Sequence, residues 1–140
     1  MTDAATPAGA RLIELPRFSD ARGTLAVIEE AGLPFAVRRF YCLYDVPRGQ
    51  RRGGHAHRTE QELILALAGR LRLVVDDGRA RREFALERPD LGLYVPALHW
   101  HELFDFSPGC VCAVLASQPY DKDDYFDRYE DFLAHLRARA

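Results

Sequence analysis

Long apolar runs, a basic signal segment and an excess of one charge are all missing from this 140-residue sequence. There is no run of about 18 consecutive apolar residues, so we expect no membrane-spanning helix. Residues 1–4 lack the basic start and apolar segment of a secretory signal, which predicts a cytoplasmic location. The 19 basic and 21 acidic residues give a net charge of −2, which offers nucleic acid no general attraction. Any anion that binds must therefore be held by local arginines.

Cysteine is too sparse for a disulfide framework. The three cysteines are Cys42, Cys110 and Cys112, an odd number, and the last two are too close for an ordinary disulfide and lack Cys-x-x-Cys spacing. We expect them to be reduced packing residues. Internal repeats and low-complexity tracts are also lacking, and the length suits a single domain, 1–140, with its own core.

Short β-like runs separated by turn signals fill most of the chain. Asp77-Gly78, for example, is a strong hairpin signal between two apolar runs. About nine or ten short strands with regular turns predict an all-β fold, an antiparallel sandwich or barrel. The strands are expected at Leu12–Leu15, Thr24–Glu29, Phe35–Leu43, around His55, and at Leu63–Leu67, Leu71–Val75, Arg82–Leu86, Gly92–Val95, Trp100–Phe104 and Val111–Ala116.

The two ends of the chain have different patterns. Residues 1–10 are rich in Ala and Thr and show no periodicity, so we expect a loose arm. Residues 123–139 carry aromatic and leucine side chains at spacings of three and four, with acidic residues first and arginines last. This pattern predicts a C-terminal helix that covers the barrel.

His55-Ala56-His57 is the most informative motif. Side chains alternate along a strand, so these two imidazoles face the same space. Such a pair could bind a metal, move protons near neutral pH, or simply be two partly exposed strand histidines. Gly53-Gly54 would let the backbone approach a ligand closely, and the neighbouring arginines supply positive charge.

The spacing around these histidines resembles the first signature of the cupins, which are small jelly-roll β-barrels. The five matching residues are Gly49, His55, His57, Glu62 and Gly69. The second cupin signature fits less well, because Pro96 and His101 match but Leu98 stands where glycine is usual.

Most of the chain, from about 12 to 133, resembles the nucleotide-sugar 3,4-ketoisomerases, which move the carbonyl of dTDP-4-keto-6-deoxyglucose from C4 to C3. The matching blocks are Asp20-x-Arg22-Gly23-x-Leu25, Ile28-Glu29-Glu30, Pro34-Phe35, Arg39-x-Tyr41, Arg52-Gly53-x-His55-Ala56-His57, Val75-Asp76-Asp77-Gly78, Gly92-Leu93-Tyr94-Val95, Trp100-His101-Glu102, Asp105-Phe106-Ser107, Leu115-Ala116-Ser117 and Tyr120-Asp121. The resemblance implies a homodimer with exchanged N-terminal strands and a dTDP-linked 4-keto-6-deoxy sugar as ligand, with no metal or other cofactor.

The resemblance also implies roles for individual residues. His57 is expected to carry a proton between C3 and C4, while His55 exchanges a proton with a sugar oxygen or polarises the carbonyl. Tyr41 is expected to assist the enediol oxygens, or else to be a core tyrosine with a satisfied hydroxyl.

Binding of the nucleotide part is expected to involve arginines. Guanidinium groups suit a diphosphate, so Arg22, Arg39 and Arg52 are assigned to it. Arg22 together with His101 resembles the subgroup whose product has the galacto configuration at C4. Trp100 is a further candidate substrate-binding residue, although packing is its alternative role.

Glu62 departs from the family pattern, which commonly has glutamine there. The carboxylate could orient His57, bind the sugar, or face solvent beside Arg70 or Arg72. With three histidines it would also make a plausible site for a transition metal. Other readings of the whole site are therefore a metal-dependent or purely ligand-binding cupin, or a dTDP-sugar 3,5-epimerase.

Overall fold

A computed structural model describes residue 7 and residues 9–140, almost all of them in or between short strands. The elements are, in order, β1 (Arg11–Glu14), β2 (Arg17–Asp20), β3 (Gly23–Ala26), η1 (Glu30–Gly32), β4 (Arg39–Leu43), β5 (Arg52–His57), β6 (Glu62–Ala68), β7 (Leu71–Asp76), β8 (Arg81–Leu86), β9 (Leu91–Val95), β10 (Trp100–Phe104), β11 (Val111–Ala116), η2 (Lys122–Asp124), β12 (Tyr125–Phe126) and α1 (Tyr129–Arg139).

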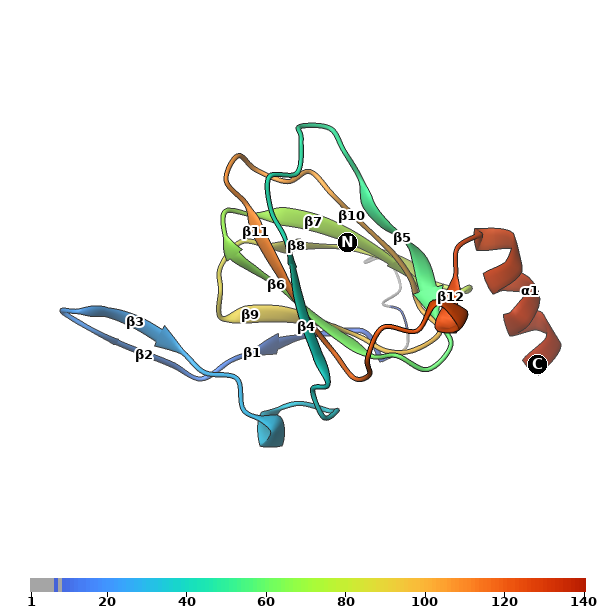
Figure 1. Ribbon diagram of the computed structural model, residues 1–140, viewed down its shortest axis with the longest axis horizontal. Coiled ribbons are helices and arrows are strands. Elements are labelled where there is room, and N and C mark those ends of the chain that lie inside the picture. The colour runs from blue at the N-terminus through green and yellow to red at the C-terminus, as the bar shows by residue number, and fades with distance from the viewer. Residues whose placement is uncertain (1–6, 8) are drawn as a thin grey trace, which may run out of the picture.

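Two five-stranded antiparallel sheets enclose the centre of the molecule (Figure 1). Their strand orders are β1-β9-β6-β11-β4 and β12-β5-β10-β7-β8. The predicted all-β, cupin-type barrel of antiparallel strands with a C-terminal helix is confirmed. Two short strands, β2 and β12, were not expected from the sequence.

Side-chain alternation divides each strand between an inner and an outer face. On β6, Ile64 packs in the core between the sheets, whereas Leu63 and Leu65 pack in a second cluster with Phe35 and Tyr94. Each fully buried leucine or isoleucine contributes about 1.5–3 kcal/mol to folding. Because Glu62 lies two residues before Ile64, the same alternation turns its carboxylate into the barrel.

The C-terminal helix is shorter than predicted, since it begins at Tyr129 and not at residue 123. The preceding residues are held extended: Asp124 accepts hydrogen bonds from the backbone N–H groups of Thr59 and Glu60, and β12 pairs with β5. Those contacts with β5 and the turn after it override the helical periodicity. Within the described part of the chain, neither α1 nor any other helix has the length and apolar character needed to cross a membrane.

The N-terminal arm was predicted over 1–10, and residues 1–6 and 8 of it lie outside the described residues. Its end is not loose, because Ala10 is buried in the core cluster and its N–H donates to the Pro7 carbonyl. A small apolar side chain fits there against the barrel, which the composition of the arm alone did not indicate.

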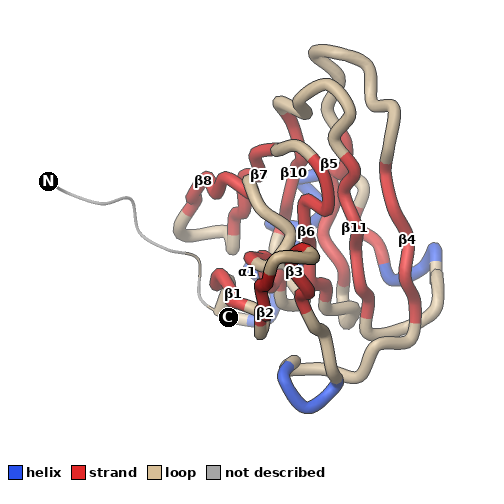
Figure 2. The backbone as a smooth tube through the Cα atoms, turned by 90° about the vertical axis from the view of Figure 1, so that its left-hand side faces the viewer, coloured by secondary structure: helices blue, strands red, loops and turns tan. Residues whose placement is uncertain are grey.

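The hairpin of β2 and β3 extends away from the barrel (Figure 1). It carries two large exposed apolar side chains, Phe18 (63% exposed) and Leu25 (60% exposed). Elsewhere in the structure, β4 forms the edge of its sheet next to β11 (Figure 2). An exposed apolar hairpin and an open sheet edge are features that a second chain can cover.

Two of the three cysteines are buried packing residues, as the sequence predicted for all three. Cys110 and Cys112 are buried in the core, while Cys42 is exposed on β4. Alternation explains the difference, because Cys42 lies between Tyr41 and Leu43, which both turn toward the core.

Candidate active site

A cavity of about 250 Å³ lies between the two sheets, and six of the predicted site residues line it. These six are Arg39, Tyr41, Arg52, His55, Glu62 and His101. Its apolar wall is formed by Ile64, Leu103 and Val114, which also belong to the core. The three remaining predicted residues, Arg22, His57 and Trp100, do not line this cavity.

His55 and His101 come from neighbouring strands. They are cross-strand partners on β5 and β10, and their ring centroids are 4.9 Å apart. The register shifts between His101 and Glu102, next to Gly53, whose φ is +78°. A Cβ on Gly53 would lie 3.0 Å from the His101 carbonyl oxygen, so glycine is needed for β5 to approach β10 this closely.

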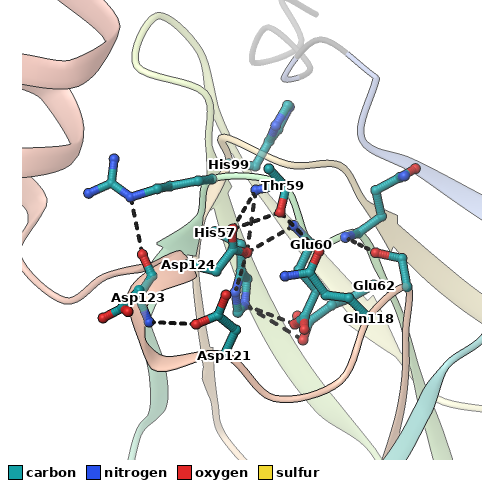
Figure 3. A network of polar contacts seen from close by, with 12 residues as sticks. His57, Thr59, Glu60, Glu62, His99, Gln118, Asp121, Asp123 and Asp124 are labelled. Carbon is teal, nitrogen blue, oxygen red and sulfur yellow. Dashed lines mark hydrogen bonds and ion pairs between the residues drawn. The ribbon is translucent and has the colours of Figure 1, made fainter.

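His57 does not line the cavity, although its ring centroid is 4.9 Å from that of His55. It is only 3% exposed and lies among carboxyl groups (Figure 3). Its Nε2 is 3.3 Å from Glu60 and 3.7 Å from Glu62, and its Nδ1 is 3.8 Å from Asp124. Asp124 is itself fixed by hydrogen bonds from the Thr59 backbone and hydroxyl. Both ring nitrogens of His57 therefore face acidic groups of the protein.

Glu62 connects the groups that line the cavity. Its Oε1 is 3.2 Å from Nε2 of His101, and its Oε2 accepts a hydrogen bond of 3.1 Å from the Tyr41 hydroxyl. His101 Nδ1 is 3.2 Å from the His99 carbonyl oxygen, so both ring N–H groups of a protonated His101 would have acceptors. Of the alternatives for Glu62, exposure to solvent beside Arg70 or Arg72 is wrong, because its side chain is buried.

The histidines differ in their preferred charge. Burial, together with His101 and His57, lowers the pKa of His55 to about 3. Burial also lowers the pKa of His57 to about 4 against the opposing effect of Glu62. The pKa of His101 is raised, because its hydrogen bond and charge interaction with Glu62 outweigh burial. The site thus combines two imidazoles that favour the neutral form with one that favours the charged form.

Tyr41 is an acid that stays protonated. Burial and the adjacent Glu62 carboxylate raise the pKa of its hydroxyl. The Arg39 guanidinium lies over the Tyr41 ring, 4.5 Å from its centroid. The side chain packs against the core and also lines the cavity, and its hydroxyl already donates to Glu62, so both predicted roles of Tyr41 stay open.

Arg22 is separated from the other two arginines. It lies in the turn of the β2–β3 hairpin, where it pairs with Asp20 at 2.6 Å and its side chain is 90% exposed. Within one chain it cannot act with Arg39 and Arg52, because the hairpin extends away from the barrel (Figure 1). The motif around Arg22 matches the family pattern, but the position of Arg22 in space depends on the direction in which the β2–β3 hairpin extends.

Trp100 is the clearest correction among the predicted substrate-binding residues. It packs with Ala56, Phe126 and Phe132 beneath α1, and its Nε1 donates to Glu102 at 3.2 Å. Since His101 points into the barrel, its neighbour Trp100 must point out. The structure therefore favours the packing alternative for Trp100.

Three residues near the cavity were missed. Tyr125 lines it, while Glu60 and Asp124 flank His57. Asp124 and Tyr125 were assigned to the helix. Glu60 belongs to no motif, and only its spacing of three from His57 in the turn after β5 pointed toward it.

Among the described residues, two groups of side chains are close enough in space to share a metal ion: His55 with His57 and His101, and His57 with Glu60 and Glu62. Proximity alone does not assign a metal here, because Glu62 already pairs with His101 and accepts from Tyr41. The prediction of a site without metal stays a prediction.

Fold and cavity together define a cupin-type barrel with a cavity of histidine, tyrosine, glutamate and arginine side chains between its sheets. The family model described as "FdtA: WxcM-like, C-terminal" matches residues 8–137, and the chain belongs to this family. The resemblance to the nucleotide-sugar 3,4-ketoisomerases is thereby confirmed, together with the class of enzyme that it implied.

Several relatives are similar over nearly the whole chain. The TDP-4-oxo-6-deoxy-alpha-D-glucose-3,4-oxoisomerase of Aneurinibacillus thermoaerophilus is 39% identical over 127 residues, 90% of this chain and 91% of the relative. The structure of a mutant of the 3,4-ketoisomerase QdtA from Thermoanaerobacterium thermosaccharolyticum in complex with TDP-4-keto-6-deoxyglucose is 30% identical. It has a TM-score of 0.92 and covers 96% of this chain and 98% of its own. A dTDP-4-dehydrorhamnose 3,5-epimerase from Elizabethkingia anophelis is 21% identical with a TM-score of 0.74, over 86% of this chain and 75% of its own, and shows the shared fold alone.

Proposed function

We propose that this protein isomerises dTDP-4-keto-6-deoxy-D-glucose to the corresponding dTDP-3-keto-6-deoxyhexose. The observation that carries the proposal is the cavity in which His55 faces His101, with His101 and Tyr41 both joined to the Glu62 carboxylate. A base, a group that favours positive charge and a hydroxyl around one small space suit an enediol mechanism.

The proton that moves between carbons needs a base that reaches both of them. The sequence assigned this role to His57, but the geometry supports His55, which lines the cavity, over His57, which does not. In the proposed reaction His55 takes the proton from C3, the C3–H electrons form the C3–C4 double bond, and O4 is protonated. The enediol then loses the O3 proton as His55 returns its proton to C4. The negative diphosphate would raise the pKa of His55 on binding.

The nucleotide must lie partly outside this cavity. A volume of about 250 Å³ is below the roughly 300–1,000 Å³ of sites for drug-sized ligands, so it suits the sugar and not the whole nucleotide. Arg39 and Arg52 at the cavity are proposed to bind the diphosphate. Arg22 would join them only from a second chain, which supports a homodimer with exchanged N-terminal strands. The hairpin's exposed Phe18 and Leu25 fit an interface of that kind.

We propose the galacto configuration at C4 of the product, because the combination of Arg22 and His101 resembles the subgroup that forms it. A 3-keto sugar is the form that an aminotransferase can convert to a 3-amino-3,6-dideoxy sugar, which is the pathway we propose. The proposed location remains the cytoplasm, where nucleotide sugars would be available.

Incubation with dTDP-4-keto-6-deoxyglucose, followed by NMR of the product, tests this function. We expect a 3-keto sugar whose H4–H5 coupling identifies the C4 configuration. Exchange of hydrogen at C5 in D₂O, with no 3-keto product, would instead identify a 3,5-epimerase. Elemental analysis of protein purified without added metal tests the metal-dependent alternative, because a stoichiometric transition metal would favour it.

A further inference from the structure

Glu60 is a second buried carboxyl beside the catalytic cavity. Its side chain is 1% exposed in the turn between β5 and β6, and its backbone N–H donates to Asp124 at 3.0 Å (Figure 3). Its Oε2 lies 3.3 Å from Nε2 of His57, and its Oε1 lies 3.9 Å from the Arg39 guanidinium. The mechanism above leaves this carboxyl without a role.

Glu60 and Glu62 lie close together. A carboxylate oxygen of each is within 4.8 Å of the other and of a ring nitrogen of His57. Two buried carboxylates this close would repel each other strongly if both were ionised, which favours one of them keeping a hydrogen. The pair therefore holds one hydrogen near neutral pH.

The surroundings decide which carboxyl keeps that hydrogen. Glu62 has His101 at 3.2 Å and the Tyr41 hydroxyl at 3.1 Å, both of which favour its ionised form. Glu60 has the His57 ring at 3.3 Å, which favours the neutral form, and the Arg39 guanidinium only at 3.9 Å, and burial and then Glu62 raise its pKa. The charged or titratable groups that face Glu60 are Arg39 and Tyr41 from β4, His57 from β5, Glu62 from β6, and Asp124 and Tyr125 from η2 and β12.

The isomerisation moves two hydrogens, and His55 accounts for only the one that passes from C3 to C4. The other leaves O3 and arrives at O4, so an acid must protonate O4 before O3 gives up its own hydrogen. Tyr41 lines the cavity, but its hydroxyl is a weak acid whose hydrogen points at Glu62. It can act only if another group replaces the hydrogen that it donates.

We propose that Glu60 and Glu62 share one hydrogen, and that Tyr41 relays it to O4 and later returns the hydrogen of O3 to the same pair. In the first half, the O–H bond of Glu60 breaks toward Glu62, Glu62 protonates the Tyr41 oxygen, and Tyr41 protonates O4. In the second half each transfer reverses, starting from O3. The enzyme ends with the hydrogens it began with, while C3 is oxidised and C4 is reduced.

This inference rests on the proposed function, and the variant Glu60→Gln tests it. The amide keeps the shape, the neutral charge and a donor toward Glu62, but it cannot relay a proton. We expect kcat to fall about 10²-fold with KM changed less than about twofold. The wild-type kcat should decline as alkaline pH removes the hydrogen of Glu60, and this limb should be missing in Glu60→Gln. The exposed Glu87→Gln is the matched control and should behave as wild type.

A readout without substrate separates this inference from the function. Infrared spectra at neutral pH should contain the C=O band of a protonated carboxylic acid in wild type and Glu87→Gln, and lack it in Glu60→Gln. If Glu60→Gln does not fold, Glu60→Asp keeps an acid and should shift the band. A wild-type protein that shows the band but makes no 3-keto sugar refutes the function and hence the relay, while the shared hydrogen stands.

The relay through Tyr41 has its own test. In a Tyr41→Phe background, adding Glu60→Gln should lower kcat by no more than about twofold, because the path is already broken. An equal loss in both backgrounds, an unchanged kcat in Glu60→Gln, or a wild-type spectrum without the carboxylic acid band would overturn the proposal.

Discussion

His55 and His101 lie directly opposite each other on β5 and β10, and the protein favours opposite charge states for them. Burial lowers the pKa of His55 to about 3, whereas Glu62 raises that of His101. A ring that favours the neutral form can act as the base, while a ring that favours the charged form can stabilise negative charge on the sugar oxygens. This contrast, and not the His-x-His pair alone, assigns the catalytic roles that we test below.

The first prediction separates the two histidines of β5. His55→Asn should lower kcat by about 10²–10⁴-fold, because it removes the base at the cavity. His57→Asn should cost at least tenfold less, since His57 does not line the cavity. Loss of the C3 proton to D₂O, followed by NMR, measures the step directly. An inactive His57→Asn beside an active His55→Asn would return the role of base to His57.

The second prediction concerns the charge of His101. NMR titration should show His101 still protonated above its usual pKa of 6.5, and Glu62→Gln should lower its pKa. Because the pKa is raised in the folded state, its contribution to stability is complete below pH 6.5 and is lost as pH rises through the folded value. Unfolding in urea across this range should show that loss in wild type. A His101 that titrates identically in both proteins would contradict the pairing.

The third prediction tests whether a second chain supplies Arg22. Arg22→Ala and His55→Asn should each be nearly inactive alone at low substrate concentration. After unfolding and refolding together they should regain about a quarter of the wild-type activity, because half of the dimers are mixed and each contains one intact site. A mixture no more active than its components, or a monomer by light scattering, would contradict the exchanged dimer.

The fourth prediction follows from the outward position of Trp100. Trp100→Phe should leave kcat and KM unchanged, because the side chain packs beneath α1 and does not line the cavity. It should lower the free energy of unfolding by about 1–2 kcal/mol through lost packing and the lost bond to Glu102. Urea unfolding measures this. A raised KM would restore Trp100 to the binding site.

The fifth prediction concerns the close approach of β5 and β10 at Gly53. Gly53→Ala should destabilise the protein by at least about 1 kcal/mol, since φ is +78° and the new Cβ would lie 3.0 Å from the His101 carbonyl. Activity should fall as well, because that contact positions His101. Gly32→Ala is the control, because its added Cβ has open space and its φ is not positive.

Much of the site could be predicted because it depends on alternation within strands. The period of two grouped His55 with His57, and the same period along β6 accounts for the inward position of Glu62, which the sequence analysis had left open. The same rule, applied to Trp100 beside His101, would have excluded Trp100 from the cavity. Leu98 also has a physical explanation, since its φ of +58° is a conformation that suits glycine, which is usual there in the second cupin signature.

The rest depends on contacts between distant segments. Asp124 reaches His57 only because η2 and β12 fold back onto β5, and Glu60 meets Arg39 only after β4 and the turn before β6 come together. No local pattern contains such pairings. For the same reason the helical spacing of Tyr125 was misleading, as its strand pairing with His57 decided its structure.

Ile64, Leu103 and Val114 form the apolar wall of the cavity and are also part of the hydrophobic core. Specificity and thermal resistance therefore cannot evolve independently in this barrel. A larger side chain at one of these three positions would crowd the sugar. A smaller one would leave a cavity and weaken the packing between the two sheets. Efforts to accept bulkier sugars would need to begin at the polar walls.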